Sequence, residues 1–459
     1  MAAADIAPRM GVRALLVERS RIGGDCLWTG CVPSKALIAS ARLAHHMRRA
    51  GDLGLAPCTL AVDTRNVMAR LREVQNGIAA NSDNAQRFES LGVTVLAGEA
   101  ALVDAHRVSV NGRVVTGRYI LLATGSRPSM PDIAGLRDAG FLTSETLFEL
   151  DYLPETIVMI GGGPIAVEMA QAMQRLGTAV ILLEALPRIL NREEPALSDR
   201  VRHTLEAEGV SVDVGVRIGR VEATEGRKRV HGIVAGAERE WECEQILAGT
   251  GRAPNIESLE LDRVGVGYTS KGVTVDDRLR TTVPSIYAAG DVAGRYLFTH
   301  SAVSEAATAL RNMFYPGSKA PTNTVPWTTF TDPELGHAGM TSAEARRSLG
   351  EENVFVFEQS LADSDRARAE GESGEIVLVT DKRYRLLGAH VLAPGAGDMM
   401  GSLADAIARG ARLTPDFANI VQVYPTVSFA ISQAAGQATY RQLGRPFLQI
   451  MRRLAALTR

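Results

Sequence analysis

The sequence has little of what several classes of protein depend on. Four cysteines among 459 residues exclude a disulfide-stabilised scaffold. No apolar run approaches the roughly 18 residues that cross a bilayer, and residues 1–12 lack the apolar segment of a signal peptide. We therefore expect a cytoplasmic protein with no membrane partner. The balance of 50 basic and 52 acidic residues argues against a nucleic-acid partner.

Lysine is also scarce, because five lysines stand beside 45 arginines. Each lysine is therefore a candidate for a specific role. The remaining composition, 46% hydrophobic and 22% charged, is that of a globular protein. At roughly 150 residues per domain, the length predicts about three domains.

Two tandem units of similar build organise the chain. Residues 9–18 match residues 175–184 as a helix end with a glycine stop, a short apolar strand and a final acid. Residues 120–125 likewise match residues 246–251, and a proline follows three residues after each final glycine. The repeated alternation of strand and helix predicts an α/β protein.

The second unit carries a dinucleotide-binding fingerprint. An apolar strand over 156–160 leads into Gly161-Gly162-Gly163-Pro164-Ile165-Ala166 and then a helical stretch, which is the G-x-G-x-x-A pattern. Gly161 permits the tight turn, Gly163 lets a pyrophosphate approach the backbone, and Ala166 keeps the helix close to its strand. Glu184 follows Gly161 by 23 residues, where an acid binds a ribose 2′-hydroxyl and repels a 2′-phosphate. The sequence therefore predicts a nicotinamide site that prefers NAD(H) over NADP(H).

The same spacing places the first unit's fingerprint outside the sequence. Counting 23 residues back from Glu18 gives position −5, so the first strand and its three glycines would precede Met1. Either the true start lies upstream, which we favour because the rest of the unit looks intact, or the chain is truncated.

A cysteine pair follows the first unit's acid. Residues 23–35 read GGDCLWTGCVPSK, with Cys26 and Cys31 five residues apart, and a helical stretch covers 34–49. Cys31 would lie at or near the N-terminus of that helix, where the dipole and free N–H groups favour a thiolate. Such a pair can close a disulfide ring and reopen on reduction. The alternatives are a zinc half-site and two buried free thiols.

The GGDCLWTGCVPSK segment resembles the redox-active motif of the two-dinucleotide-binding flavoprotein disulfide oxidoreductases, which include dihydrolipoamide dehydrogenase, glutathione reductase and mercuric reductase. The resemblance covers nearly the whole chain and is most like the mercuric reductase branch. It implies two Rossmann-like dinucleotide-binding domains, a C-terminal α+β dimerisation domain, a homodimer, and the cofactors FAD and NAD(H). Its further motifs lie at residues 123–125, 250–252, 289–291, 326–334, 365–367 and 388–390.

The resemblance also implies roles for single residues. Cys31 would be the charge-transfer thiol beside the flavin, and Cys26 the interchange thiol that faces the substrate. Lys35 would lie beside the flavin N5 and pair with Glu168. For Asp291 and for His300, at a helix start nearby, capping or packing is the competing interpretation. The expected FAD contacts are Glu18, Gly24, Lys35, Ala123, Thr124, Gly125, Asp291 and Val292, and the expected NAD contacts are Gly161, Gly163, Ala166, Glu184 and Gly251.

The implied reaction has two halves. NADH reduces FAD, and reduced FAD opens the Cys26–Cys31 disulfide. Cys26 as a thiolate then attacks an oxidised acceptor or binds a soft metal ion such as Hg²⁺. The alternatives are a catalytically impaired NAD-binding homologue, and an NADH:quinone-type flavin dehydrogenase in which the cysteines are secondary.

The sequence departs from the family near its C-terminus. The family's H-P-T-x-x-E motif, whose His–Glu pair serves the partner subunit's thiols, corresponds here to Tyr424-Pro425-Thr426-Val427-Ser428-Phe429. A phenol with a pKa near ~10 is a poor base at neutral pH, so efficient turnover of lipoamide or glutathione disulfide is not expected. Tyrosine at this place occurs in mercuric reductase-like proteins, but those also carry a cysteine pair near the C-terminus, and the last cysteine here is Cys243. The acceptor stays open.

The expected domains follow from these motifs. The FAD-binding domain would cover residues 1–150 and 277–325, the NAD-binding domain 151–276, and the dimerisation domain 326–459. Residues 445–454 form a short basic amphipathic stretch. We interpret it as a packing or surface helix rather than a membrane anchor.

Overall fold

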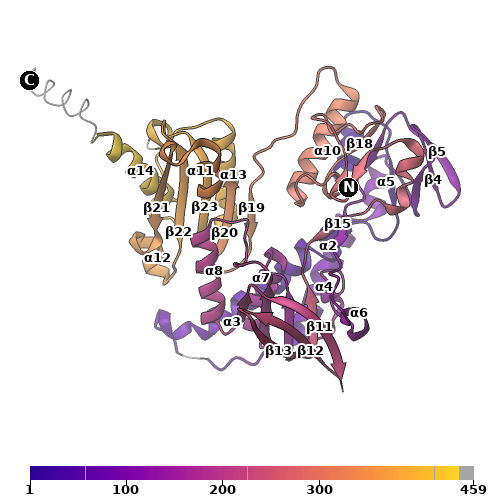
Figure 1. The fold of residues 1–459 in the computed structure, drawn as a ribbon. Helices are drawn as coiled ribbons and strands as arrows, with labels where there is room; N and C mark the ends of the chain where they lie inside the picture. Colours follow the sequence, from indigo (N-terminus) through magenta and orange to yellow (C-terminus); the bar gives the residue numbers. More distant parts are fainter. Residues whose placement is uncertain (57, 225, 418, 444–459) are drawn as a thin grey trace, which may run out of the picture.

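Two dinucleotide-binding halves and a C-terminal sheet domain make up the chain (Figure 1). The computed structural model describes residues 1–56, 58–224, 226–417 and 419–443. The basic stretch at 445–454 therefore lies outside the described residues. The predicted α/β class with a separate α+β domain is confirmed.

The NAD-binding half is built on a parallel sheet of β10 (Ser211–Val214), β9 (Ala179–Glu184), β8 (Thr156–Ile160) and β14 (Gln245–Ala248), in that order. Strand β8 is continuously apolar because the sheet is covered on both faces, and its Ile157 and Met159 are fully buried. Helices α7 (Pro164–Arg175) and α8 (Pro195–Ala207) follow β8 and β9. An antiparallel sheet joins this half, formed by β11 (Arg217–Thr224), β12 (Arg227–Val234) and β13 (Ala237–Cys243).

The chain enters the NAD-binding half before the boundary that the sequence predicts. Leu142 pairs in parallel with Leu247 of β14, and its N–H donates to the Ile246 carbonyl at 2.7 Å. This segment extends the sheet beyond β14. The predicted boundary at residue 150 therefore falls after the first contact with this sheet.

The FAD-binding half repeats the same plan with one interruption. Strand β1 (Leu15–Glu18) pairs in parallel with β2 (Thr94–Ala97), and β6 (Ile120–Leu122) pairs in parallel with β18 (Ile286–Ala288). In the NAD-binding half β8 joins the strands that match β1 and β6, whereas here no described strand joins them. Leu16 is consequently partly exposed, although its counterpart Leu182 is fully buried.

Helices and a small sheet surround these strand pairs. Helix α1 (Ala2–Arg9) packs on α10 (Thr299–Phe314) through Ala7, Leu310 and Met313. The remaining elements of this half and its connections are α2 (Gly24–Trp28), α3 (Cys31–Arg48), α4 (Thr64–Asn81), α5 (Ala85–Ser90), α6 (Leu136–Ala139), α9 (Leu261–Val264), β3 (Ala100–Leu102), β4 (Arg107–Val110), β5 (Arg113–Thr116), β16 (Tyr268–Thr269) and β17 (Gly272–Val273).

The two halves contact each other through matching segments. Strand β7 (Ser126–Pro128) follows the 120–125 motif, and β15 (Arg252–Pro254) follows the 246–251 motif. They pair antiparallel, with Arg252 opposite Pro128 and Pro254 opposite Ser126. The repeat seen in the sequence thus appears in the structure as two matching strands, one from each half, that pair with each other where the halves meet.

The C-terminal domain is an antiparallel sheet in the order β19-β20-β23-β22-β21. Helix α13 (Ala396–Ala408) contacts β20 and β23, and α14 (Phe429–Leu443) contacts β21 and β22. No helix in the described part of the chain is long and apolar enough to cross a membrane. The other elements are β19 (Trp327–Thr329), β20 (Glu334–Gly339), α11 (Ser342–Leu349), β21 (Val354–Ser360), α12 (Asp365–Glu370), β22 (Glu375–Asp381) and β23 (Leu386–Ala393).

Candidate active site

The two cysteines lie on consecutive helices. Cys26 belongs to the short α2, and Cys31 is the first residue of α3, where the sequence placed it. Gln75 of α4 fixes the end of α2, because its buried Nε2 donates to the carbonyls of Leu27 and Trp28 at 3.0 and 2.8 Å. Pro33 fits the first turn of α3, where no N–H donor is needed. The two cysteines are therefore positioned by the helices α2 and α3 and by the side-chain amide of Gln75, which holds the end of α2.

The thiols of Cys26 and Cys31 are free and hydrogen-bonded to each other. The hydrogen bond from Cys26, the Thr299 hydroxyl at 3.5 Å and the charge of Lys35 lower the pKa of Cys31 to about 6, although burial opposes them. The hydrogen bond to Cys31 and burial raise the pKa of Cys26. The surroundings therefore favour the thiolate at Cys31 and the protonated thiol at Cys26.

The role of Cys26 as the attacking thiolate stays a prediction. Its pKa is raised by its contact with Cys31 and by burial, so Cys26 would have to lose its proton before it attacks an acceptor.

The Lys35–Glu168 ion pair expected from the sequence is present. Lys35 Nζ lies 2.8 Å from Glu168 Oε2, and the Glu168 side chain is only 8% exposed. Phe330 completes the group, since its backbone N–H donates to Glu168 Oε1 at 2.9 Å and its ring centroid lies 4.2 Å from Lys35 Nζ. A carboxylate, a backbone donor and an aromatic face therefore fix the lysine next to α3's first turn.

A second charged group crosses from the NAD-binding half to the cysteines. Arg252 Nη2 lies 3.0 Å from Asp25 Oδ2, and its Nε donates to Ser126 Oγ at 2.7 Å. The Ser126 hydroxyl donates in turn to Asp291 Oδ2 at 2.5 Å. Burial raises the pKa of Asp291. Asp291 thus joins a hydrogen-bonded network, beyond the simple cap considered from sequence.

The glycine loop before α7 has the shape that dinucleotide binding requires. Gly161 adopts a φ of +107°, and a Cβ there would lie 2.6 Å from the Gly249 carbonyl oxygen. A Cβ at Gly163 would meet no atom within 4 Å, so the loop is open on that side. Ala166 is fully buried, and its Cβ lies 3.2 Å from the position of a Cβ built on Gly249. Each small residue has the local role expected from the fingerprint.

Glu184 lies against this loop. One carboxylate oxygen accepts from the Gly162 N–H, and the other accepts from the Leu186 N–H at 2.7 Å. The acid therefore sits at the end of β9 beside the glycine turn, which is where a ribose hydroxyl would reach it.

Comparison with known proteins identifies the family. The pyridine nucleotide-disulphide oxidoreductase domain matches residues 1–306, and the dimerisation domain of the same family matches residues 325–435. The chain belongs to the pyridine nucleotide-disulphide oxidoreductases. Members of this family use FAD and NAD(P)H.

Curated relatives within the family differ in function. The mercuric reductase of Bacillus cereus is 33% identical over 85% of this chain, which spans 62% of that protein's length. The mercuric reductase of Acidithiobacillus ferrooxidans is 33% identical over 89% of this chain and 75% of its own length. The dihydrolipoyl dehydrogenase of Chlamydia pneumoniae is 30% identical over 97% of this chain and 95% of its own length.

Solved structures include close matches of the whole fold. The HOCl-induced flavoprotein disulfide reductase RclA from Escherichia coli superposes with a TM-score of 0.82, at 25% identity, over 95% of this chain and 96% of that one. A Cu(II) complex of the same reductase superposes with a TM-score of 0.83, at 26% identity, over 94% and 96% of the two chains.

The described residues fit the family's flavin at its redox-active end. Lys35, Asp291 and the cysteine pair converge there, and a Cβ built on Gly125 or Gly251 would meet no atom within 4 Å. Thr124 precedes Gly125 and Val292 follows Asp291 in the sequence: the Thr124 hydroxyl donates to the Asn255 carbonyl at 2.7 Å, and Val292 is buried. Their contact with a flavin stays a prediction.

The adenosine end of the expected flavin site is less complete. Glu18 accepts from the Ser20 N–H at 2.8 Å, and Gly24 begins α2 close by in sequence. Ala123 directly follows β6, which ends at Leu122. The strand and glycine loop that would complete this end are not among the described residues, so the roles of Glu18, Gly24 and Ala123 stay predictions.

Tyr424 lies apart from the cysteines of its own chain. Its hydroxyl donates to Asp365 Oδ2 at 2.6 Å, and this carboxylate raises the pKa of the phenol. Its ring contacts Phe429 edge-on at a centroid distance of 5.6 Å. The side chain is 61% exposed. At neutral pH even less of this tyrosine is therefore present as the phenolate that could accept a proton than for a free phenol.

Sequence reasoning missed several residues that shape the site. Thr299 reaches Cys31 across 268 positions of sequence, and Gln75 and Phe330 act through one amide and one backbone N–H. Arg252 is part of the Thr-Gly-Arg motif, which was read only as the end of a nicotinamide domain. The signal that could have identified Arg252 is its charge, because the other residues of the motif, Thr250 and Gly251, are small and uncharged.

Proposed function

We propose that the protein passes electrons from NAD(P)H through FAD to the Cys26–Cys31 pair and from there to a soft metal ion. The observation that carries this proposal is the pair of free thiols, Cys26 and Cys31, which act on each other's pKa and lie within reach of the charge of Lys35. The glycine loop before α7 is open at Gly163, as a nicotinamide site would require. When bound, the flavin supplies two-electron transfer between the nicotinamide and the disulfide.

The residues of the chain give each part of this reaction a physical basis. Two sulfurs close enough to hydrogen-bond can ligate one thiophilic ion together, and binding releases the proton from Cys26. Transfer of two electrons to a divalent ion such as Hg²⁺ leaves the neutral metal and a Cys26–Cys31 disulfide. Two electrons from NAD(P)H restore the dithiol. Lys35 keeps a positive charge beside Cys31 throughout.

The hydrogen bond of Tyr424 with Asp365 supports a metal ion rather than a disulfide as the acceptor. A disulfide acceptor needs a proton for its leaving thiol, and a tyrosine held by Asp365 is a poor proton shuttle. A metal ion needs no such group. The mercuric reductases among the relatives and the Cu(II) complex of RclA agree with this preference.

We further propose that the protein works as a homodimer and prefers NADH. The family's dimerisation domain is present, and its surface exposes a row of large apolar side chains that a second copy would cover. These are Ile420, Val421, Val423 and Tyr424, at 47, 96, 74 and 61% exposure. The preference for NADH rests on Glu184.

The test is an acceptor panel with FAD and either nicotinamide. Hg²⁺, Cu²⁺, lipoamide, glutathione disulfide and a quinone are each supplied to the wild type, to Cys26→Ser and Cys31→Ser, and to Cys58→Ser as a control for an exposed thiol outside the pair. We expect metal-dependent NADH oxidation that both pair variants abolish and the control retains. Undiminished quinone turnover in Cys26→Ser would support the NADH:quinone alternative, and no turnover with any acceptor would support the impaired homologue.

A further inference from the structure

The first residues of the dimerisation domain lie against both sides of the dithiol. We define residues 326–330, which contain β19, as the β19 strap. It contacts the start of α10 at one end and the Lys35–Glu168 pair at the other. Both contacted groups in turn act on Cys31.

At one end the strap holds the two neighbours of Thr299. The Phe298 ring stacks on Trp327 at a centroid distance of 5.7 Å and an interplanar angle of 13°. His300 Nε2 donates to the Pro326 carbonyl at 2.7 Å. Thr299 lies between these two anchored residues, with its hydroxyl 3.5 Å from Cys31 Sγ. The position of that hydroxyl is therefore fixed by the strap.

At the other end the strap holds the lysine. Phe330 donates its N–H to Glu168 and presents its ring to Lys35 Nζ at 4.2 Å. Loss of this contact would free Glu168 to rotate away from the lysine, because only one of its oxygens bonds Lys35.

The strap is itself fixed from behind by buried groups. The ring of Trp327 stacks on His337 at 3.7 Å, and its Nε1 donates to Glu193 Oε1 at 2.7 Å. The other oxygen of Glu193 accepts from His337 Nδ1 at 3.0 Å, and both side chains are almost completely buried. Trp327 therefore has one orientation, set by the NAD-binding half and the dimerisation sheet together.

From this geometry we infer that the β19 strap is a positioning element for the redox centre: Trp327, acting through Phe298, holds the Thr299 hydroxyl within hydrogen-bond distance of Cys31 Sγ. The inference rests on the proposed function in that the Cys26–Cys31 pair is the redox centre. It assigns to the dimerisation domain a role toward the cysteines of its own chain.

The experiment compares Trp327→Leu with the conservative Trp327→Phe, which keeps a stacking ring. Thr299→Val removes the hydroxyl directly, and Phe355→Leu is the control for an aromatic residue elsewhere in the same domain. Two quantities are measured on the full-length protein: the pH midpoint of Cys31 alkylation by iodoacetamide, followed by peptide mass spectrometry, and the dithiol–disulfide equilibrium against dithiothreitol buffers.

We expect a wild-type midpoint near 6, raised by about one pH unit in Trp327→Leu and in Thr299→Val. The equilibrium should move about tenfold toward the disulfide, which is ~30 mV for two electrons, because the stabilised thiolate favours the reduced form. The double variant should add little to either single one, since both act on one hydrogen bond. Trp327→Phe and Phe355→Leu should stay near wild type.

Two results would overturn the inference: an unchanged midpoint in Trp327→Leu, or effects of Trp327→Leu and Thr299→Val that add in full. If Trp327→Leu does not fold, Phe298→Leu interrupts the same contact from the other side and is judged by the same two measurements. A pair that never interconverts between dithiol and disulfide in the wild type would instead refute the proposed function. If the wild-type pair interconverts between dithiol and disulfide but the strap variants change neither measured quantity, this inference is refuted and the proposed function is not.

Discussion

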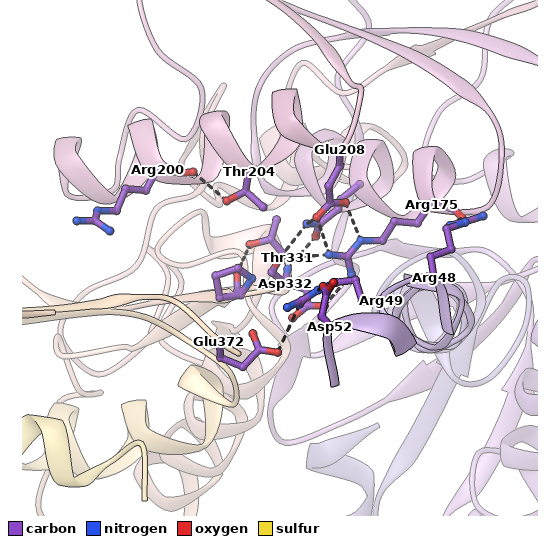
Figure 2. Close-up of polar contacts among 12 residues, drawn as sticks. Arg48, Arg49, Asp52, Arg175, Arg200, Thr204, Glu208, Thr331, Asp332 and Glu372 are labelled. Atoms are coloured by element: carbon purple, nitrogen blue, oxygen red, sulfur yellow. Dashed lines mark hydrogen bonds and ion pairs between the residues drawn. The ribbon is translucent and has the colours of Figure 1, made fainter. Parts of the chain in front are cut away.

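Replacing Arg175 by methionine is expected to destabilise the protein by about 3–5 kcal/mol. Figure 2 shows this arginine between Glu208 and Asp332. Its Nε and Nη2 bond the two oxygens of Glu208 at 2.7 and 2.6 Å, and its Nη1 bonds Asp332 Oδ2 at 2.7 Å. The arginine side chain is 5% exposed and the two acids 13 and 14%. The substitution thus leaves two nearly buried carboxylates without the arginine that pairs with both of them.

The loss of stability in Arg175→Met should also depend on pH. Burial alone would raise the pKa of Asp332, but Arg175 outweighs burial and holds that pKa below its ordinary value. Without the arginine, burial raises the pKa of Asp332 and only the charges of Arg42 and His46 oppose it. We therefore expect the folded-state pKa to move above the unfolded one. Such a raised pKa favours folding at low pH and loses that advantage as pH rises through the unfolded pKa of about 4. The loss of stability relative to wild type should therefore be smaller at pH 4 than at pH 7.

Urea denaturation of both proteins at pH 4, 5.5 and 7 tests this reasoning. Arg200→Met is the matched control, because Arg200 lies on α8, pairs with Glu375 at 2.7 Å and is 48% exposed. A half-exposed pair is worth about 0–1 kcal/mol. A loss below about 1 kcal/mol for Arg175→Met, or a loss that does not change with pH, would refute the assignment of this group as a buried charge cluster.

Three other predictions follow from single positions. Gly161→Ala should destabilise the fold by about 1–3 kcal/mol because its Cβ meets the Gly249 carbonyl, whereas Gly163→Ala should leave the denaturation midpoint unchanged and weaken NADH binding in a titration; equal effects would contradict the loop assignment. Glu184→Ala should raise the kcat/KM of NADPH relative to NADH by about tenfold, and an unchanged ratio would remove the basis for NADH preference. Burial lowers the pKa of His390 to about 4, so stability should fall by about 3 kcal/mol from pH 6.5 to 4; His390→Leu should flatten that slope, and an equal slope in both proteins would contradict it.

Local patterns were sufficient to predict much of the fold. The strand, glycine turn and helix from Thr156 to Arg175 appear as expected, because backbone freedom at Gly161 and apolar burial in β8 act within a few residues of sequence. The internal repeat also predicted the parallel strands β9 and β14 as counterparts of β1 and β6. The placement of Cys31 at the first turn of α3 followed from Pro33 and the preceding glycine in the same way.

Long-range contacts could not be predicted from the motifs. Thr299 and Phe330 reach the site only because α10 and β19 are brought beside α3 by the packing of three domains. Neither residue is chemically distinctive, since the one contributes a hydroxyl and the other a backbone N–H. The pairing of Leu142 with β14 could not be predicted for a similar reason, because it depends on a strand that follows it by about a hundred residues. The boundary at residue 150 stays a prediction.

The pKa values of the two cysteines differ because local sequence and long-range contacts both favour a thiolate at Cys31. A helix start and an adjacent lysine are encoded within a few residues of Cys31 and already favour its thiolate. The Cys26 thiol lies within α2, where its surroundings raise its pKa. The long-range contacts favour the same thiolate, because the hydrogen bond with Thr299 lowers the pKa of Cys31 and Glu168 holds Lys35 in place. Sequence and tertiary packing therefore bias the pair in one direction, which leaves Cys26 with the proton that an incoming metal ion would displace.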